Sequence, residues 1–319
     1  MRRALCVGID EYKFGPLRGC VSDAECMASV LSRHEDGSPN FDCRLLIAPS
    51  GAGTSVITRE ILREQLDQLF RDPADLVIFH FSGHGTANNL DGYLVTQDAK
   101  KYDAGVAMAD LLKLANNSRT SEVVILLDCC FSGALGNPPS IDNSKTLLRE
   151  GVSILTASRE DQPSVEVGGG GVFTSLVHSA LDGGAADILG SVKVPAIYAY
   201  VEAALGAWQQ RPLFKSHVSR LISLRNCTPP VNRAFLRNLP ELFPLPAEDL
   251  PLDPSFEPQS AQPETAKVAR FCQLQALNRV HLVMPVDALH MYEAAMTSKS
   301  CRLTPSGRYY WRLAKCGRI

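Results

Sequence analysis

The sequence lacks long hydrophobic runs, net charge and internal repeats. No apolar stretch approaches the roughly 20 residues needed to cross a bilayer, so we expect no membrane-spanning segment. The first residues include two arginines but only a short apolar run before Asp10, too short for the core of a signal peptide. The net charge is −2, and no repeated segment indicates a repeat architecture.

The ten cysteines occur in patterns that do not suggest disulfides. Several of them, including Cys6, Cys26 and Cys272, lie inside apolar strand or helix patterns. Without a signal-peptide core, this usage indicates reduced thiols and a cytoplasmic protein. With 45% hydrophobic and 21% charged residues, the 319-residue chain has the composition of a folded protein, long enough for one large domain and a smaller one.

Apolar runs alternate with helical patterns through the first 225 residues. Ser22 and Glu25 fit a capping box, with Ser22 as the N-cap of the first helix. Strands alternating with helices predict an α/β fold in which a mainly parallel sheet is covered on both faces. We expect strands at 3–9, 41–48, 75–81, 93–96, 123–127, 152–156 and 217–224, and helices at 22–34, 58–70, 106–115, 172–181 and 195–210.

The remainder of the chain divides into two stretches. Residues 226–264 hold nine of the 20 prolines and predict a linker or a strap over the surface. Helical periodicity resumes in residues 265–319, where Thr304-Pro305 can begin a last helix and Gly317 can end it. This last stretch has nine Lys/Arg and two Asp/Glu, or +7, which leaves the rest of the chain at −9. We therefore expect a small, basic, mostly helical C-terminal domain with its own partner.

The stretch 122–133, EVVILLDCCFSG, combines a buried strand with reactive side chains. The apolar run 123–127 ends in Asp128 and two thiols, and loops past the carboxyl ends of parallel strands form the ligand crevice. Strand periodicity turns Asp128 and Cys130 to one face and Cys129 to the other. A thiol at this position is a candidate nucleophile.

His84 is the candidate partner of that thiol. It follows the buried strand 75–81, and the glycines on either side allow a substrate to approach closely. A free thiol, with a pKa of about 8.5, is only slightly ionised at neutral pH, so a nearby histidine is needed to favour the thiolate. His84 and Cys130 can therefore form a catalytic dyad.

These segments resemble a known family. HFSGHG at 80–85 and DCCFSG at 128–133 are similar to the two signature segments of caspase-like cysteine peptidases, in the metacaspase and bacterial caspase-homologue branch. The histidine and cysteine lie 46 residues apart, close to the spacing of about 50 in caspases. The resemblance covers residues 1–225, and further segments fit in the expected order: LRGCVSDA (17–24), DGYLVTQDA (91–99), ILTASREDQ (154–162) and GVFTSLV (171–177).

The resemblance implies a fold and a site. It implies a caspase-like three-layer α/β sandwich in which His84 is the catalytic histidine and Cys130 the nucleophile. The backbone N–H groups of Gly85 and Cys130 would stabilise the oxyanion. Asp23 and Asp128 match two acids that line the pocket for the residue before the cut in metacaspase-like members. Two carboxylates favour a cationic side chain, so the expected activity is endopeptidase cleavage of proteins after Arg or Lys.

The sequence departs from the family pattern at the nucleophile, where two adjacent cysteines are candidates. Cys129-Cys130-Phe131 stands where metacaspases commonly have Ser-Cys-His, and position in the motif favours Cys130 as the nucleophile. His80, His84 and the two cysteines could be imagined as zinc ligands, but no CxxC spacing supports a closed site. We interpret His80 as a packed core residue and expect no metal.

Several features bear on regulation. The polar loop 133–150 contains Lys145 and Arg149, which fit the predicted specificity and are candidate activation cleavage sites. The glycine run 168–171 lacks the ending of a phosphate-binding loop, so we interpret it as part of the active-site surroundings. The chemistry requires no cofactor. No EF-hand-like acidic loop is present, and the sequence leaves open whether calcium is needed.

The C-terminal domain suggests a regulated enzyme. Its end resembles that of a winged-helix domain, but we expect a protein regulator or upstream protease as its partner, rather than nucleic acid or a membrane. Simple packing on the catalytic domain is the other alternative. The family resemblance suggests an effector in bacterial antiviral defence or cell death. The rival hypothesis is a catalytically silent scaffold that recruits partners through this domain.

Overall fold

The computed structural model describes residues 1–51, 56–87, 91–100, 103–129, 148–157, 166–167, 170–205 and 212–319. They form two compact units. Unit 1 comprises residues 1–186 and 191–228, and unit 2 comprises residues 187–190 and 229–319. Within the described ranges, no helix is both long and apolar enough to cross a membrane.

Unit 1 is built on a six-stranded sheet with the order β12-β8-β7-β3-β1-β2. The first five strands of the chain in this sheet run parallel, and only the edge strand β12 is antiparallel to its neighbour. The mainly parallel sheet predicted from the sequence is therefore confirmed. The strands are β1 (Arg2–Ile9), β2 (Asp42–Ala48), β3 (Leu76–Ser82), β7 (Glu122–Asp128), β8 (Val152–Thr156) and β12 (Leu213–His217).

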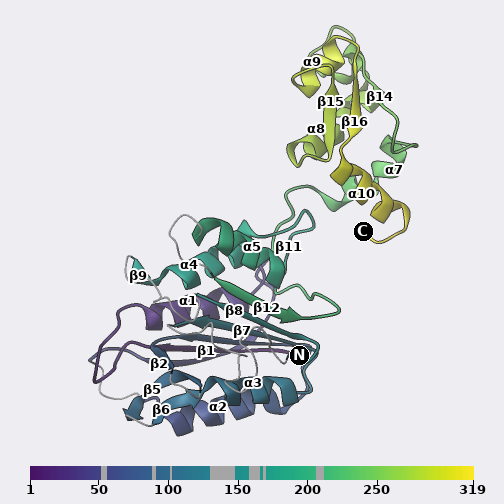
Figure 1. Cartoon of the computed structure of the whole chain (residues 1–319). Helices are drawn as coiled ribbons and strands as arrows, with labels where there is room; N and C mark the ends of the chain where they lie inside the picture. Colours follow the sequence, from purple (N-terminus) through teal and green to yellow (C-terminus); the bar gives the residue numbers. More distant parts are fainter. Residues whose placement is uncertain are drawn as a thin grey trace. The chain divides into compact units, whose positions relative to one another are not determined.

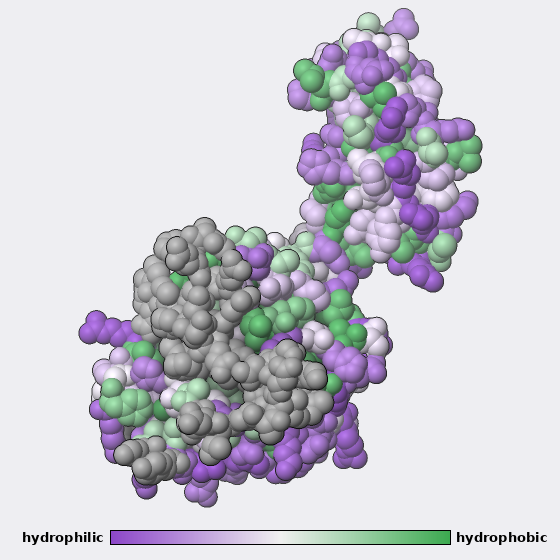
Figure 2. All heavy atoms as spheres, viewed as in Figure 1, coloured by the Kyte–Doolittle hydropathy of each residue, from purple (hydrophilic) through white to green (hydrophobic). Residues whose placement is uncertain are grey.

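Helices cover both faces of this sheet (Figure 1). One face packs against α1 (Cys20–Ser32), α4 (Val172–Ser179) and α5 (Val194–Leu205), and the other against α2 (Arg59–Arg71) and α3 (Met108–Asn117). The unbroken apolar run of β7 fits this three-layer arrangement, because its side chains enter the two cores alternately. The outer side of α2 is hydrophilic (Figure 2).

Smaller elements lie at both ends of the strands of this sheet. A three-stranded antiparallel sheet has the order β4-β5-β6, and β9 pairs with β10. A π-helical turn at Ala180–Gly184 follows α4, and β11 pairs with β13. Their bounds are β4 (Gly85–Ala87), β5 (Gly92–Lys100), β6 (Asp103–Ala107), β9 (Glu166–Val167), β10 (Gly170–Gly171), β11 (Ser191–Val192) and β13 (Arg225–Asn226).

The last strand of the sheet is not the predicted one. The expectation was a strand at 217–224, but the chain pairs with β8 through Leu213–His217 instead. As an edge strand, β12 has only half-buried and exposed residues, so it lacks the buried apolar run that identifies the central strands.

The start of α1 also differs from the prediction. Ser22 is exposed inside the helix, and no side chain caps it from within the helix. Instead, Asp10, just past β1, accepts hydrogen bonds from the backbone N–H groups of Gly19, Cys20 and Val21 at 3.1, 2.8 and 3.4 Å. A distant carboxylate thus satisfies the unpaired N–H groups of the first turn and complements the helix dipole.

Close packing of β1 on α1 requires Gly8. A Cβ atom at this position would lie 2.1 Å from the Cys20 carbonyl oxygen and 2.9 Å from the Ala24 Cβ. The glycine therefore lets the helix start lie directly on the end of β1, within reach of Asp10.

Unit 2 includes the proline-rich stretch as folded structure. Residues 229–264 contribute α6 (Arg233–Arg237), α7 (Leu239–Leu242), β14 (Leu250–Pro251) and a 3₁₀ turn (Pro254–Phe256). The interpretation of residues 226–264 as a linker or strap was therefore wrong, because their apolar side chains complete the core of unit 2. Those side chains are Val231, Leu236, Leu239, Leu242, Phe243, Leu252 and Phe256.

The rest of unit 2 is helical as expected, but it also contains a sheet. The helices are α8 (Thr265–Arg279), α9 (Met291–Met296) and α10 (Pro305–Lys315). Thr304 caps α10 through the Gly307 N–H, and Gly317 follows its end with a positive φ of 65°, as the sequence predicts. Strands β15 (Val283–Val286) and β16 (Ser300–Leu303) pair antiparallel, with β14 on the other side of β16. Residues 265–319 therefore share one sheet with the preceding stretch.

The charge of unit 2 is also more balanced than its C-terminal part suggests. The whole unit has eleven Lys/Arg and nine Asp/Glu, or +2. Acids from the proline-rich stretch pair with the cations: Arg302 with Asp249 at 2.8 Å, and Lys267 with Asp253 at 3.0 Å. These ion pairs place acids of the proline-rich stretch beside cations of the basic stretch, over a shared apolar core.

The cap on α1 gives a testable prediction. Replacing Asp10 by Ala should lower the free energy of unfolding by about 1–2 kcal/mol, because three backbone N–H groups lose their acceptor. Ser22→Ala is the matched control and should change it by less than about 0.5 kcal/mol, since Ser22 is exposed. Urea unfolding of both variants measures this. A larger loss in Ser22→Ala than in Asp10→Ala would refute the assignment.

Candidate active site

The predicted site residues lie at the carboxyl edge of the sheet, around β1, β3 and β7. The chain passes from β1 to β2 on one side and returns to β3 on the other, so the strand order reverses between β1 and β3. Such a switch point is where α/β sheets form a ligand crevice. Three segments meet there: the β1–α1 loop, the end of β3 leading to His84, and the end of β7 at Asp128.

The β1–α1 loop holds His84. The His84 Nε2 atom lies 2.6 Å from the Gly15 carbonyl oxygen. A carbonyl oxygen can only accept, so Nε2 donates this hydrogen bond and Nδ1 is the ring nitrogen left for proton exchange. The rings of Tyr12 and Phe14 pack beside the imidazole, at centroid distances of 4.6 and 5.8 Å.

Tyr12 also fixes the backbone of His84. Its hydroxyl accepts a hydrogen bond from the His84 N–H at 3.1 Å and donates one to the Val95 carbonyl oxygen at 3.2 Å. Burial raises the pKa of the Tyr12 hydroxyl well above its ordinary value, so it keeps the proton that it donates. One buried phenol therefore joins the β1–α1 loop, the histidine and β5.

The structure brings Asp23 and Asp128 together at the start of α4. The Gly171 N–H donates to both Asp23 carboxylate oxygens, at 3.2 and 3.1 Å. The Thr174 N–H and hydroxyl donate to Asp128 Oδ2 at 3.1 and 2.8 Å. Asp23 and Asp128 are 7% and 5% exposed, so these are buried carboxylates held by a helix N-terminus.

Gly171 is the point at which the two acids converge. A Cβ atom there would lie 2.0 Å from Asp128 Oδ2 and 3.0 Å from Asp23 Oδ2. Because both oxygens lie within these distances of one point, they are at most 5.0 Å apart. Only glycine leaves room for both carboxylates at this helix start.

Two more residues belong to this cluster, although the motif analysis did not assign them a role. Ser82, at the end of β3, donates to Asp23 Oδ2 at 2.8 Å. The buried Cys20 thiol lies within hydrogen-bond reach of Ser82, and burial raises its pKa, so it remains protonated. The strand register could have indicated Ser82, because Ser82 pairs with Asp128 between β3 and β7.

Of the two adjacent cysteines, the structure describes Cys129 only. Cys129 is 1% exposed and packs in the core on the α2/α3 side, opposite the face from which Asp128 contacts α4. That is the packing position that strand periodicity predicts. Cys130 lies outside the described residues. Gly85, the other predicted oxyanion residue, begins β4 directly after His84.

The two candidate activation sites are Lys145, which lies outside the described residues, and Arg149. Arg149 is anchored, because its guanidinium donates to the carbonyl oxygens of Ala115, Thr120 and Glu150 at 3.2, 2.7 and 2.6 Å. Cleavage requires an extended, accessible backbone, so these contacts favour a structural role for Arg149.

Among the described residues, no group of three or more His, Cys, Asp or Glu side chains is arranged to hold a metal ion. His80 lies on the same face as Asp128, whereas Cys129 lies on the other, so the imagined zinc set does not converge. His80 is 1% exposed, as expected for a packed histidine.

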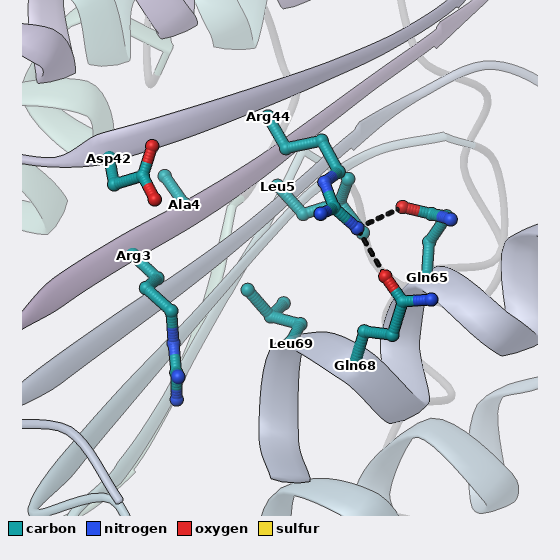
Figure 3. A pocket seen from close by; sticks show the side chains of 8 residues that line it. All are labelled: Arg3, Ala4, Leu5, Asp42, Arg44, Gln65, Gln68 and Leu69. Atoms are coloured by element: carbon teal, nitrogen blue, oxygen red, sulfur yellow. Dashed lines mark hydrogen bonds between the residues drawn. The ribbon is translucent and has the colours of Figure 1, made fainter. Parts of the chain in front are cut away.

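A separate small pocket lies at the other end of the strands (Figure 3). It is lined by the first residues of β1 and β2 and by α2, and Arg44 donates to Gln65 at 2.6 Å inside it. Its volume of about 80 Å³ has room for a few water molecules only. It is not continuous with the carboxyl-edge site.

Comparison with known proteins identifies similar sequences. The profile of the peptidase family described as the caspase domain matches residues 1–222. Metacaspase-1 of Botryotinia fuckeliana is 26% identical over 212 residues, which cover 60% of this chain and 47% of the relative. Metacaspase-2 of Trypanosoma brucei brucei is 30% identical over 155 residues, or 43% of each chain. The chain spans about half the length of the curated relatives it matches.

Two solved structures share the fold. Caspase-1 from Spodoptera frugiperda superposes with a TM-score of 0.52 at 12% identity, over 71% of this chain and 90% of that one. A protein from Geobacter sulfurreducens superposes with a TM-score of 0.50 at 17% identity, over 69% of this chain and 94% of that one. At these identities the similarity concerns the fold, which agrees with the three-layer sandwich expected from the sequence.

Proposed function

Because the chain belongs to the caspase-domain peptidase family, we propose that it is a cysteine endopeptidase that cleaves proteins after Arg or Lys. The observation that carries this proposal is the convergence of Asp23 and Asp128 at the carboxyl edge of the sheet. Ser82 contacts Asp23 and precedes His84 by only two residues, which supports a specificity pocket next to the catalytic histidine.

In the proposed reaction, Cys130 attacks the scissile carbonyl carbon. His84 takes the thiol proton and gives it to the leaving amine as the C–N bond breaks. Water then hydrolyses the thioester, with His84 as the base. The N–H groups of Gly85 and Cys130 stabilise the oxyanion, and the Gly15 carbonyl keeps the imidazole oriented throughout. No cofactor takes part in these steps.

The two acids explain the proposed selectivity. A guanidinium or ammonium group entering the pocket would meet two carboxylates within about 5 Å of each other. An acidic side chain would be repelled by the same two charges, at a cost of several kcal/mol. The pocket therefore selects by charge.

The rival hypothesis is a catalytically silent scaffold with the same fold. A scaffold has no need to keep a histidine oriented by Gly15 and Tyr12 beside a pair of buried acids. Both members of the dyad are present in the sequence, which favours an active enzyme.

Peptide substrates test the proposal directly. Peptides ending in Arg or Lys should be cleaved more than about 100-fold faster, in kcat/KM, than the same peptide ending in Asp, because of charge repulsion in the pocket. Asp23→Asn and Asp128→Asn should each lower kcat/KM for the Arg peptide by about 10- to 100-fold. Faster cleavage of the Asp peptide would contradict the proposal.

Cysteine variants serve as matched controls in that assay. Cys130→Ala should reduce kcat by about 10⁴ or more, because no nucleophile remains. Cys129→Ala removes a thiol from the opposite face and should leave kcat within a factor of about 3 if the fold is kept. Activity that survives Cys130→Ala but not Cys129→Ala would reverse the assignment.

We also propose that the enzyme is activated by cleavage after Lys145 in the loop 133–150. Arg149 fits this role poorly, since three carbonyl oxygens hold its guanidinium. A cut in this loop would release the segment that follows the nucleophile.

Mass spectrometry of the purified enzyme tests this activation. Lys145→Ala should abolish the cut and delay the onset of activity. Arg149→Ala should leave the cut in place but lower the melting temperature, because it loses three hydrogen bonds worth about 1 kcal/mol each. Full activity of the uncut wild-type protein would remove the proposal.

Unit 2 is proposed to bind an acidic protein partner that regulates the enzyme. Arg308, Arg312 and Lys315 lie at i, i+4 and i+7 on α10, all exposed, and none of them has an ion-pair partner among the described residues. Other cations of this unit, such as Arg302, are already paired. Trp311 is turned inward, donating to the Phe243 carbonyl at 2.7 Å, so its ring is withdrawn from a nucleic acid, whereas Tyr309 stays 53% exposed.

The α10 face can be tested with charged probes. A polyglutamate peptide should bind the wild-type protein, and Arg308→Glu with Arg312→Glu should weaken binding at least tenfold. Arg279→Glu, an exposed cation at the end of α8, is the matched control and should have little effect. Tighter binding of single-stranded DNA than of polyglutamate would assign the face to nucleic acid instead.

The cellular setting is proposed from the family and from the thiols. The nine cysteines that the structure describes form no disulfide with one another, which fits a reducing cytoplasm. A regulated endopeptidase with an attached partner-binding unit fits an effector in bacterial antiviral defence or cell death.

A further inference from the structure

A second layer of buried polar groups lies beneath the proposed specificity pocket. His80 on β3 contacts Thr174 on α4, with 3.2 Å between His80 Nε2 and the Thr174 hydroxyl. That hydroxyl is in turn 2.8 Å from Asp128 Oδ2. His80 and Thr174 are each 1% exposed, so neither can contact a substrate. The chain His80–Thr174–Asp128 crosses from the central sheet to α4 and ends on a pocket acid.

The direction of each hydrogen bond follows from the groups involved. Burial lowers the pKa of His80 to about 3, so its ring is neutral at working pH. The Asp128 carboxylate accepts the hydrogen bond from the Thr174 hydroxyl, so the Thr174 O–H points to Asp128. The hydroxyl then accepts from His80, which places the proton on Nε2; within the described chain, His80 Nδ1 has no partner. The histidine therefore prevents the Thr174 hydroxyl from rotating away from Asp128.

Asp128 needs such support because of its neighbour. Asp23 Oδ2 and Asp128 Oδ2 are at most 5.0 Å apart, and two carboxylates this close raise each other's free energy of ionisation. The Gly171 N–H and the Ser82 hydroxyl donate to Asp23, and the Thr174 N–H and hydroxyl donate to Asp128. The Thr174 hydroxyl is a side-chain donor whose direction is set by a second side chain, His80.

We propose that His80 and Thr174 are positioning residues that keep the Asp128 carboxylate charged and oriented, and so set the preference for a cationic over a neutral side chain. This inference rests on the proposed function, since it assigns Asp128 to the specificity pocket. It gives His80 a role beyond core packing and accounts for a buried histidine with one ring nitrogen committed to a hydroxyl.

Two peptides that differ in one group test the inference. One ends in arginine and the other in citrulline, an uncharged side chain of nearly the same shape. Thr174→Val keeps the shape but removes the hydroxyl, and it should lower the ratio of the two kcat/KM values about tenfold, mainly through a higher KM for the arginine peptide. Thr174→Ser should restore the ratio to within about threefold of wild type, because it keeps the donor.

Variants of His80 provide an independent test of the inference. His80→Phe removes the donor to Thr174 and should lower the arginine-to-citrulline ratio about threefold to tenfold. His80→Gln retains an N–H donor and should keep more of the ratio than His80→Phe. Circular dichroism confirms that each variant is folded before its kinetics are compared.

A purely structural role predicts a different result. In that case Thr174→Val slows cleavage of both peptides equally, and the ratio stays at the wild-type value, which overturns the inference. If Asp128→Asn lowers the ratio while Thr174→Val leaves it unchanged, the proposed function stands and only the inference fails.

A binding measurement separates the two proposals fully. Benzamidine, a cationic mimic of arginine, should bind the wild-type protein, and its Kd should rise about tenfold in Thr174→Val but not in Thr174→Ser. A wild-type protein that binds benzamidine in this way without cleaving peptides supports the inference and contradicts the proposed function. A wild-type protein that neither binds benzamidine nor cleaves the arginine peptide contradicts both.

Discussion

Two buried carboxylates, held at most 5.0 Å apart, are the constraint on which the rest of the site depends. Bringing like charges together inside a protein is unfavourable unless donors surround them. The donors come from the start of α4, through Gly171 and Thr174, and from Ser82 at the end of β3. Asp23 itself lies on α1 and Asp128 on β7. The acid pair therefore forms only when the sheet and both helices are assembled.

One loop links this acid pair to His84, the proposed catalytic histidine. The loop between β1 and α1 begins at Asp10, which caps the helix that carries Asp23. The same loop supplies Tyr12 and the Gly15 carbonyl, which fix the backbone and the ring of His84. The acid pair and the histidine are thus positioned by a single short segment.

Local signals in the sequence were enough to predict the central fold and the motif residues. The apolar run of β7 and the Thr304 cap of α10 depend on neighbouring residues only, and both are confirmed. The convergence of Asp23 and Asp128, which are 105 positions apart in the chain, was available only through the family resemblance.

The features that were missed depend on distant contacts. Asp10 replaces Ser22 as the cap because the fold brings the end of β1 to the start of α1. The proline-rich stretch 226–264 has weak periodicity, and its short helices are stabilised by packing against α8 and α10 rather than by their own pattern. His80 was interpreted as a core residue because nothing in the strand pattern indicates that Thr174 lies beside it.

The most direct measurement of the central claim is covalent labelling with an arginyl chloromethyl ketone, followed by peptide mapping. The account predicts one adduct per chain, located on Cys130, absent from Cys130→Ala and strongly slowed in Asp128→Asn, with little labelling by the corresponding aspartyl reagent. Equal labelling by the two reagents, or an adduct on another cysteine, would contradict a cysteine peptidase that selects basic side chains through Asp23 and Asp128.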